Sequence, residues 1–178
     1  MVSVTKNIQL QEIKVSDIDV LHSLMSEIYP PAYQDLWKDN GDWYVQEIYS
    51  KENVTKELLE EKADYYFVVF NDKIIGNFRI IWDEIVPQFP SKKTVKLHRI
   101  YLHQNTQGKG IGKQLMIWLE NKAAKKGYQI LWLDVMDCKE KVFNFYKNLG
   151  FIAISHTFLP YNLLHKNVRR MSQVYKEI

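Results

Sequence analysis

The segment from Gln107 to Lys113 reads Gln-Gly-Lys-Gly-Ile-Gly-Lys and is suited to bind a phosphorylated ligand. Its glycines lack side chains, so a ligand can approach the backbone closely. A helix is predicted to begin here, and helix N-termini present unpaired N–H groups and a partial positive charge that favour phosphate. Lys109 and Lys113 add positive charge. The segment therefore predicts a cradle for a diphosphate, with a flexible turn as the alternative.

Two better-known phosphate loops do not fit this segment. A P-loop has four residues between its glycines and a serine or threonine after its lysine. Here three residues separate Gly108 from Gly112, and Gln114 follows Lys113. The dinucleotide fingerprint G-x-G-x-x-G opens the first βαβ unit of its fold, whereas the pattern here is G-x-G-x-G and comes late in the chain.

A second segment, Phe145 to Phe151, combines a packed helix with a reactive hydroxyl. Gly150 is expected to end this helix, and Phe145, Leu149 and Phe151 are expected to pack in the core. Tyr146 directly follows Phe145, so the two side chains leave the helix in different directions. The hydroxyl of Tyr146 can therefore point into a cleft.

Together, these two segments resemble the GNAT superfamily of N-acetyltransferases. The Gln107–Gly112 segment is similar to its Q/R-x-x-G-x-G/A motif, and Phe145–Phe151 is similar to its F-Y-x-x-x-G-F element. The resemblance is specific from about Lys96 to Phe151. Within the superfamily, the residues His98–Leu102 and the strand that contains Trp132 look like the spermidine/spermine (PaiA-like) branch.

The order of predicted elements agrees with this resemblance. Hydrophobic periodicity and turn residues predict strands over 8–15, 65–70, 74–82, 94–102, 130–135, 151–156 and 168–175. They predict helices over 18–28, about 53–62, from after Lys109 to Gly127, and 140–149. We expect Pro30 and Pro31 to end the first helix, a loop and a short helix within 32–49, and a bulge at Gly76.

The alternation of strands and helices predicts a mixed α/β (α+β) sheet that is covered by helices. The resemblance makes this a single N-acetyltransferase domain, residues 1–178. It implies a mostly antiparallel sheet of about seven strands, with helices on both faces and two splayed central parallel strands.

The resemblance implies that acetyl-CoA, the acetyl donor, binds between the splayed strands 94–102 and 130–135. Backbone groups of the first strand would hold the pantetheine arm, amides of the glycine segment would hold the pyrophosphate, and Tyr146 would be the general acid for the departing thiolate. The cofactor-binding residues implied are Ile100, Tyr101, Leu102, Gln107, Gly108, Lys109, Gly110, Ile111, Gly112, Lys113, Lys139 and Tyr146. Lys139 replaces an asparagine that relatives often have, and a lysine there can approach a CoA phosphate instead. No metal is implied.

Direct attack on the thioester needs a neutral amine, whereas an alkyl ammonium has a pKa of about 10.4. A base must therefore remove a proton. Glu84 and His98 are the candidates because they lie on or beside neighbouring strands, with Asp134 behind them. A shift of register by one residue would turn His98 to the other face of the sheet. The alternatives are a surface carboxylate and a packed histidine.

Composition limits the partners. The net charge of +3 is too small for a nucleic-acid binder, and no apolar run is long enough for a membrane span. A single cysteine, Cys138, fits a reducing compartment, so a cytoplasmic location is expected. The resemblance also allows a homodimer.

The predicted function is acetyl transfer from acetyl-CoA to a primary amine of a small molecule, with a polyamine as one candidate. Acidic residues in the first half favour a polycation, as do the aromatic residues Trp37, Trp43 and Tyr44, which can hold a cation or complete the core. The basic pair Arg169-Arg170 weakens the polyamine interpretation. The alternatives are an acetyltransferase for protein N-termini or lysines and a non-catalytic CoA-binding module. The acidic residues are Glu27, Asp35, Asp39, Asp42 and Glu47.

Overall fold

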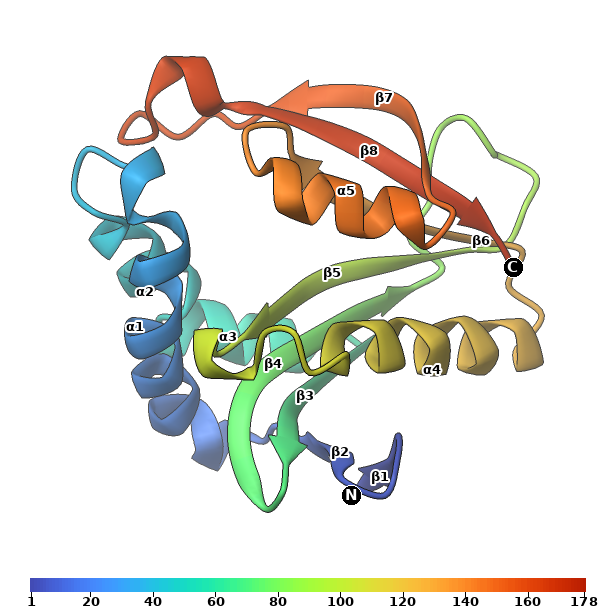
Figure 1. The fold of residues 1–178 in the computed structure, drawn as a ribbon, viewed down its shortest axis with the longest axis horizontal. Coiled ribbons are helices and arrows are strands. Elements are labelled where there is room, and N and C mark those ends of the chain that lie inside the picture. Colours follow the sequence, from blue (N-terminus) through green and yellow to red (C-terminus); the bar gives the residue numbers. More distant parts are fainter.

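The computed structural model describes residues 1–178 and contains one eight-stranded sheet with helices on both faces (Figure 1). The strands are β1 (Val2–Ser3), β2 (Ile8–Glu12), β3 (Ala63–Phe70), β4 (Lys73–Trp82), β5 (Thr94–Leu102), β6 (Ile130–Met136), β7 (Ile152–Phe158) and β8 (Arg170–Glu177). The α-helices are α1 (Ile18–Tyr33), α2 (Asp42–Ile48), α3 (Lys51–Leu58), α4 (Ile111–Lys125) and α5 (Glu140–Asn148). None of these helices is both long and apolar enough to cross a membrane.

The sheet has a central parallel pair that separates. Its order is β1-β2-β3-β4-β5-β6-β8-β7, and every neighbouring pair except β5 and β6 is antiparallel. Residues Thr94–Lys96 of β5 pair with Ile130–Trp132 of β6, and no further pairs form although both strands continue. The two halves of the sheet diverge toward α1 and α2 (Figure 1). The expected fold class, with its splayed central strands, is confirmed.

Two hydrophobic clusters cover the two faces of the sheet. The first joins α4 and α5 to the sheet, and the second joins α1, α2 and α3 to the opposite face. Side chains alternate between the faces of a strand. On β6, Leu133 and Val135 therefore belong to the first cluster, while Met136 packs against the second. The sheet thus separates an α4–α5 side from an α1–α3 side.

The prediction that Pro30 and Pro31 end the first helix was wrong, because α1 continues to Tyr33 with both prolines inside it. Proline removes a backbone donor, which deprives two carbonyls of the preceding turn of their helical partners. The loss falls in the last turn, where the Gln34 N–H still donates to the Pro30 carbonyl and the neighbouring Tyr29 is buried. Packing of this turn therefore outweighs the missing bonds.

Other element boundaries differ by a few residues. The first long strand, β2, ends at Glu12 instead of residue 15, because the chain turns where the Lys14 N–H donates to Asp17 Oδ2 at 2.9 Å. The two-residue strand β1 was not predicted, since two residues are too few to show alternation. The short helix expected within 32–49 is α2.

Two bulges shape the strands beside the parallel pair. One lies at Gly76, as predicted, and a Cβ at this position would lie only 2.0 Å from the Tyr101 carbonyl oxygen. The second bulge was not predicted: the register shifts between Arg79 and Ile80 of β4, which leaves His98 of β5 without a partner. Bulges bend a strand and redirect its side chains. This one lies where β5 leaves β6.

Candidate active site

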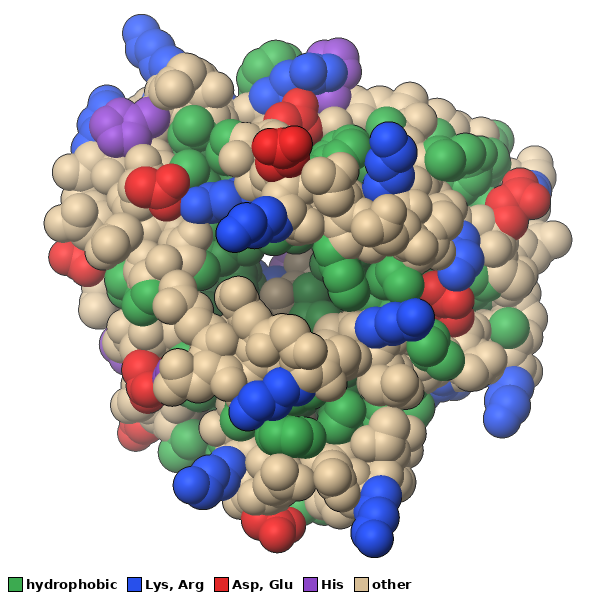
Figure 2. Space-filling view, viewed as in Figure 1, with side chains coloured by type: hydrophobic (Ala, Val, Ile, Leu, Met, Phe, Trp, Pro, Cys, Tyr) green, Lys and Arg blue, Asp and Glu red, His purple; other side chains and the backbone are tan.

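A cavity of about 260 Å³ lies where β5 and β6 separate. Its walls come from β5 and β6, from α1 and α2 on one face of the sheet, and from α5 on the other, and the segment 159–171 closes one side. Figure 2 shows the molecule deeply hollowed at its centre, with hydrophobic and basic side chains around the opening. The cavity is therefore lined from both faces of the sheet.

The glycine segment forms the start of α4 and offers free backbone donors. Gly108 and Gly110 have φ values of 77° and 74°, in the left-handed region that favours glycine, and a Cβ at either would meet nothing within 4 Å. None of the N–H groups from Gly108 to Lys113 donates a hydrogen bond within the chain. Lys109 and Lys113 are exposed beside them. This open, positively charged cradle suits an anionic diphosphate.

Tyr146 lies on α5 and lines the cavity. Its ring packs edge-on against Phe145 and Phe151, at centroid distances of 5.1 and 5.7 Å. Its hydroxyl makes no hydrogen bond within the chain, and burial raises the pKa of Tyr146 above its usual value. The hydroxyl therefore keeps its proton at neutral pH and is free to donate it to a ligand in the cavity.

The end of β5 contributes to both sides of the sheet. Ile100 and Tyr101 line the cavity, whereas Leu102 does not and instead packs beside the glycine segment, 3.9 Å from where a Cβ on Gly112 would lie. Ile100 packs with the α4–α5 cluster, and Tyr101 packs with the α1–α3 cluster.

Lys139 lines the cavity at the N-terminus of α5. Its Nζ donates to Asp35 Oδ1 at 2.9 Å and lies 5.3 Å from the centre of the Tyr33 ring. In this arrangement the lysine connects α5 to the segment after α1. It is therefore held beside the cavity by a carboxylate.

Of the three candidate bases, Glu84 does not line the cavity. It follows β4, and its carbonyl accepts hydrogen bonds from Thr94 Oγ1 at 2.5 Å and from Trp132 Nε1 at 3.0 Å. Thr94 lies at the end where β5 and β6 are still paired. The sequence could not show this, because the position of Glu84 depends on how the loop after β4 folds.

Asp134 lines the cavity and lies on β6 two residues beyond Trp132, the last residue of β6 that pairs with β5. Its Oδ2 pairs with Lys96 Nζ at 2.8 Å, whereas its Oδ1 is buried and has no hydrogen-bond partner. Buried carboxylate oxygens are normally hydrogen-bonded. The free Oδ1 is therefore available to a donor that enters the cavity.

His98, the second candidate, lines the cavity as a neutral ring. Burial, together with the positive charges of Arg99, Arg79 and Lys96, lowers the pKa of His98 to about 2. Arg79 Nη1 donates to His98 Nδ1, so the proton of the neutral ring is on Nε2. Nε2 can then donate a hydrogen bond but cannot accept a proton. This geometry argues against His98 as the base.

The depressed pKa of His98 predicts a pH-dependent stability. Between the folded pKa of about 2 and an unfolded value of about 6.5, the unfolded chain binds more protons, so stability falls as pH decreases below 6.5. We expect the free energy of unfolding, measured with urea, to fall between pH 6.5 and 5.0 with a slope of up to about 1.4 kcal/mol per pH unit. His98→Gln, which keeps an acceptor for Arg79, should flatten this slope. His156→Gln, a change at an exposed position, should leave it unaltered.

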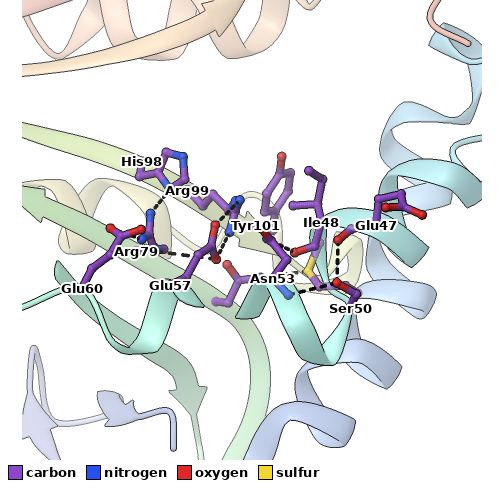
Figure 3. A network of polar contacts seen from close by, with 12 residues as sticks. Glu47, Ile48, Ser50, Asn53, Glu57, Glu60, Arg79, His98, Arg99 and Tyr101 are labelled. Atoms are coloured by element: carbon purple, nitrogen blue, oxygen red, sulfur yellow. Dashed lines mark hydrogen bonds and ion pairs between the residues drawn. The ribbon is translucent and has the colours of Figure 1, made fainter. Parts of the chain in front are cut away.

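A buried ionic network holds the β5 bulge to α3 (Figure 3). Arg99 donates from both Nη atoms to Glu57, at 2.6 and 2.8 Å, and Arg79 donates from Nη2 to Glu60 at 2.6 Å. The Arg79 side chain is only 1% exposed. The network and the pocket residue Tyr161 were not found from the sequence, because their partners are far apart along the chain and no local motif marks them.

Aromatic side chains form the α1–α3 side of the cavity. Of the three residues proposed from the sequence, Trp37 and Tyr44 line it, and Trp43 instead packs on Tyr161 at 5.0 Å. Trp37 is fixed by a hydrogen bond from its Nε1 to Tyr29 Oη at 2.9 Å.

Comparison with known proteins agrees with this geometry. A curated relative, described as an uncharacterized N-acetyltransferase in the pepI 3′ region of Lactobacillus delbrueckii subsp. lactis, is 21% identical over 154 residues, covering 85% of this chain and 89% of the relative. The crystal structure of the PaiA N-acetyltransferase from Thermoplasma acidophilum with coenzyme A has a TM-score of 0.73 at 20% identity, covering 96% of this chain and 99% of that one.

The structure of RimL, an alpha-N-acetyltransferase of a ribosomal protein, in complex with coenzyme A has a comparably similar fold. Its TM-score is 0.74 at 18% identity, and the match covers 99% of this chain and 97% of RimL. The sequence model of the acetyltransferase (GNAT) family matches residues 20–151, which include most of α1, the splayed strands, the glycine segment and Tyr146. The chain therefore belongs to the acetyltransferase (GNAT) family.

Proposed function

We propose that this chain transfers the acetyl group of acetyl-CoA to the primary amine of a small molecule. One observation supports this above all: the cavity between β5 and β6 has the free hydroxyl of Tyr146 at its α5 side and lies next to the strand end that leads to the unpaired amides of Gly108–Lys113. A cradle for a diphosphate and a proton donor are the two groups that an acyl-CoA ligand needs from the protein.

The residues present fit acetyl-CoA. The amides from Gly108 to Lys113 would hold its pyrophosphate, because they are unpaired and a Cβ built on Gly108 or Gly110 would point into open space. Backbone groups of Ile100 and Tyr101 lie unpaired with β6 along the wall of the cavity and would hold the pantetheine arm. That the bound structures of PaiA and RimL contain coenzyme A supports the same assignment.

Bound acetyl-CoA would supply a thioester whose carbonyl carbon is attacked by the amine nitrogen, so that a C–N bond forms, the C–S bond breaks and the thiol leaves. Two protons leave the ammonium nitrogen during the transfer. Tyr146 Oη gives its proton to the departing sulfur and takes one proton from the nitrogen in return. The second proton of the nitrogen passes to water. A general acid of this kind contributes typically about 100- to 10,000-fold to a rate.

The shape of the cavity favours a small amine over a protein substrate. The segment after α1 is tied to the C-terminal loop: the Lys38 N–H donates to the Leu163 carbonyl and the His165 N–H donates to the Leu36 carbonyl, both at 2.9 Å. Trp37 and Leu164 form a bridge between them. These contacts close the acceptor side, where an extended polypeptide would need an open groove. The free cysteine, Cys138, fits a cytoplasmic location for this activity.

Two measurements test the proposal. Calorimetric titration with acetyl-CoA should show saturable binding, and a free-thiol assay with a mixture of primary amines should then show CoA release that depends on the amines. Binding without amine-dependent release would instead support a non-catalytic CoA-binding module. No binding at millimolar acetyl-CoA would mean that the glycine segment is only a turn.

Gly110→Val should weaken acetyl-CoA binding by roughly tenfold or more, because the new side chain occupies the space above the amides and one charge-assisted hydrogen bond is worth about 1.5–3 kcal/mol. Calorimetry measures the effect. Gly127→Val is the matched control: Gly127 also has a positive φ, of 78°, and open space around its Cβ, but it lies at the other end of α4. Equal affinity losses in both variants would assign the effect to backbone strain and contradict the cradle.

A further inference from the structure

The α1–α3 side of the cavity is an aromatic enclosure. It is built from α1, the segment that follows α1, α2, β5 and the loop before β8. The Tyr44 ring stacks on Tyr29 with centroids 4.3 Å apart, and Tyr33 stacks on Tyr29 at 4.9 Å. Six of the residues that line the cavity belong to this enclosure: Tyr29, Tyr33, Trp37, Tyr44, Tyr101 and Tyr161.

The basic side chains that line the cavity are already neutralised. Lys96 pairs with Asp134, Arg99 pairs with Glu57, and Lys139 pairs with Asp35. A strongly anionic acceptor would therefore find no free cation to bind.

The acidic residues that could attract a polycation lie elsewhere. Asp134 is the only acidic residue that lines the cavity. Glu27 pairs with His103, and its side chain is 65% exposed. Asp39 accepts from the backbone N–H groups of Gly41 and Trp43, at 3.2 and 2.8 Å, at the start of α2. None of the acidic residues proposed from the first half of the sequence lines the cavity, so they do not surround the acceptor.

Asp134 offers one free acceptor atom for one amine nitrogen. Its neighbours Leu133 and Val135 point to the α4–α5 side, so its carboxylate points to the aromatic side. Lys96 occupies Oδ2 only, and Oδ1 is buried without a partner. An amine nitrogen has N–H donors that can satisfy this oxygen.

From this arrangement we infer that the acceptor is a monoamine with an aromatic or otherwise apolar body, not a polyamine. The inference rests on the proposed acetyl transfer and names its substrate class. Spermidine would bring further ammonium groups into a cavity whose single carboxylate, Asp134, already pairs with Lys96, and a buried charge without a partner is strongly unfavourable. An aromatic body instead gains contact with flat ring faces. The amine nitrogen donates to Asp134 Oδ1, and the body lies among Tyr44, Trp37 and Tyr161.

The test compares kcat/KM for 2-phenylethylamine and for spermidine by thiol release from acetyl-CoA, with acetyl-CoA binding measured on the same sample. We expect 2-phenylethylamine to be preferred by at least about tenfold. A tenfold ratio corresponds to about 1.4 kcal/mol, which one aromatic contact can supply. A preference for spermidine would overturn the inference and leave acetyl transfer standing. If acetyl-CoA bound but no amine caused thiol release, the proposed function would be overturned together with the inference.

Two variants locate the binding contacts. Tyr161→Ala should raise KM for 2-phenylethylamine about tenfold with little change in kcat, while Tyr161→Phe, which keeps the ring, should restore a low KM. Tyr161 lies in a loop and is half-buried, so its truncation is expected to be compatible with folding. Asp134→Asn should raise KM for 2-phenylethylamine without changing the affinity for acetyl-CoA. An unchanged KM in both Tyr161→Ala and Asp134→Asn would contradict the inferred site.

Discussion

Tyr146→Phe is expected to lower kcat by about 100-fold or more, the contribution of a general acid, while the Kd for acetyl-CoA changes little. The ring of Tyr146 packs between Phe145 and Phe151, and phenylalanine keeps those contacts. Only the hydroxyl is lost, and it makes no hydrogen bond within the chain, so the fold does not depend on it. Steady-state thiol release gives kcat, and calorimetry gives the Kd.

Tyr175→Phe is the matched control, because Tyr175 is half-buried on β8 and does not line the cavity. It should keep the wild-type kcat. The raised pKa of Tyr146 also fixes the sign of a pH effect: the hydroxyl holds its proton above its ordinary range, so alkaline pH up to about 9 should not remove the acid. An unchanged kcat in Tyr146→Phe would exclude the acid role, and a large rise in Kd would show a role in binding instead.

The parts of the site that the sequence predicted are those with a local signal. Glycines at alternating positions before an amphipathic helix indicated the cradle, and the structure places its free amides at the start of α4. The tyrosine that directly follows Phe145 on a short helix indicated a hydroxyl that can point into a cleft, and Tyr146 lines the cavity. In both cases the position of a residue follows from neighbours within one turn of helix or one loop.

The parts that could not be predicted depend on contacts between distant segments. Gly76 marks its own bulge, because a side chain there would collide with the Tyr101 carbonyl. The bulge at His98 has no glycine to mark it, and it decides whether His98 faces Arg79 or a substrate. The pairing of Asp134 with Lys96 and the entry of Tyr161 into the cavity likewise depend on how β5, β6 and the C-terminal loop assemble.

Glu57 shows this limit most clearly. In the sequence it is one charged residue in the stretch Lys51–Lys62, where charges usually indicate a solvated helix face. In the structure its side chain is 10% exposed and lies against two buried arginines, with Arg99 held by two hydrogen bonds and Arg79 Nε 3.8 Å away (Figure 3). Since Arg99 also lines the cavity next to the β5 bulge, this carboxylate connects α3 to the wall of the site.

Glu57→Gln is therefore expected to destabilise the fold by about 3 kcal/mol or more, because removing one partner leaves a buried charge without compensation. Glutamine keeps the shape and one acceptor, so the loss reports the charge. Urea unfolding at pH 7 measures it, and Glu61→Gln, a change at an exposed residue without an ion pair, is the matched control and should change stability by less than about 0.5 kcal/mol. If both variants lost equally little stability, the network would not hold β5. If Glu57→Gln folds, KM for the amine should rise more than the Kd for acetyl-CoA, since Arg99 borders the acceptor side and the cradle is at α4.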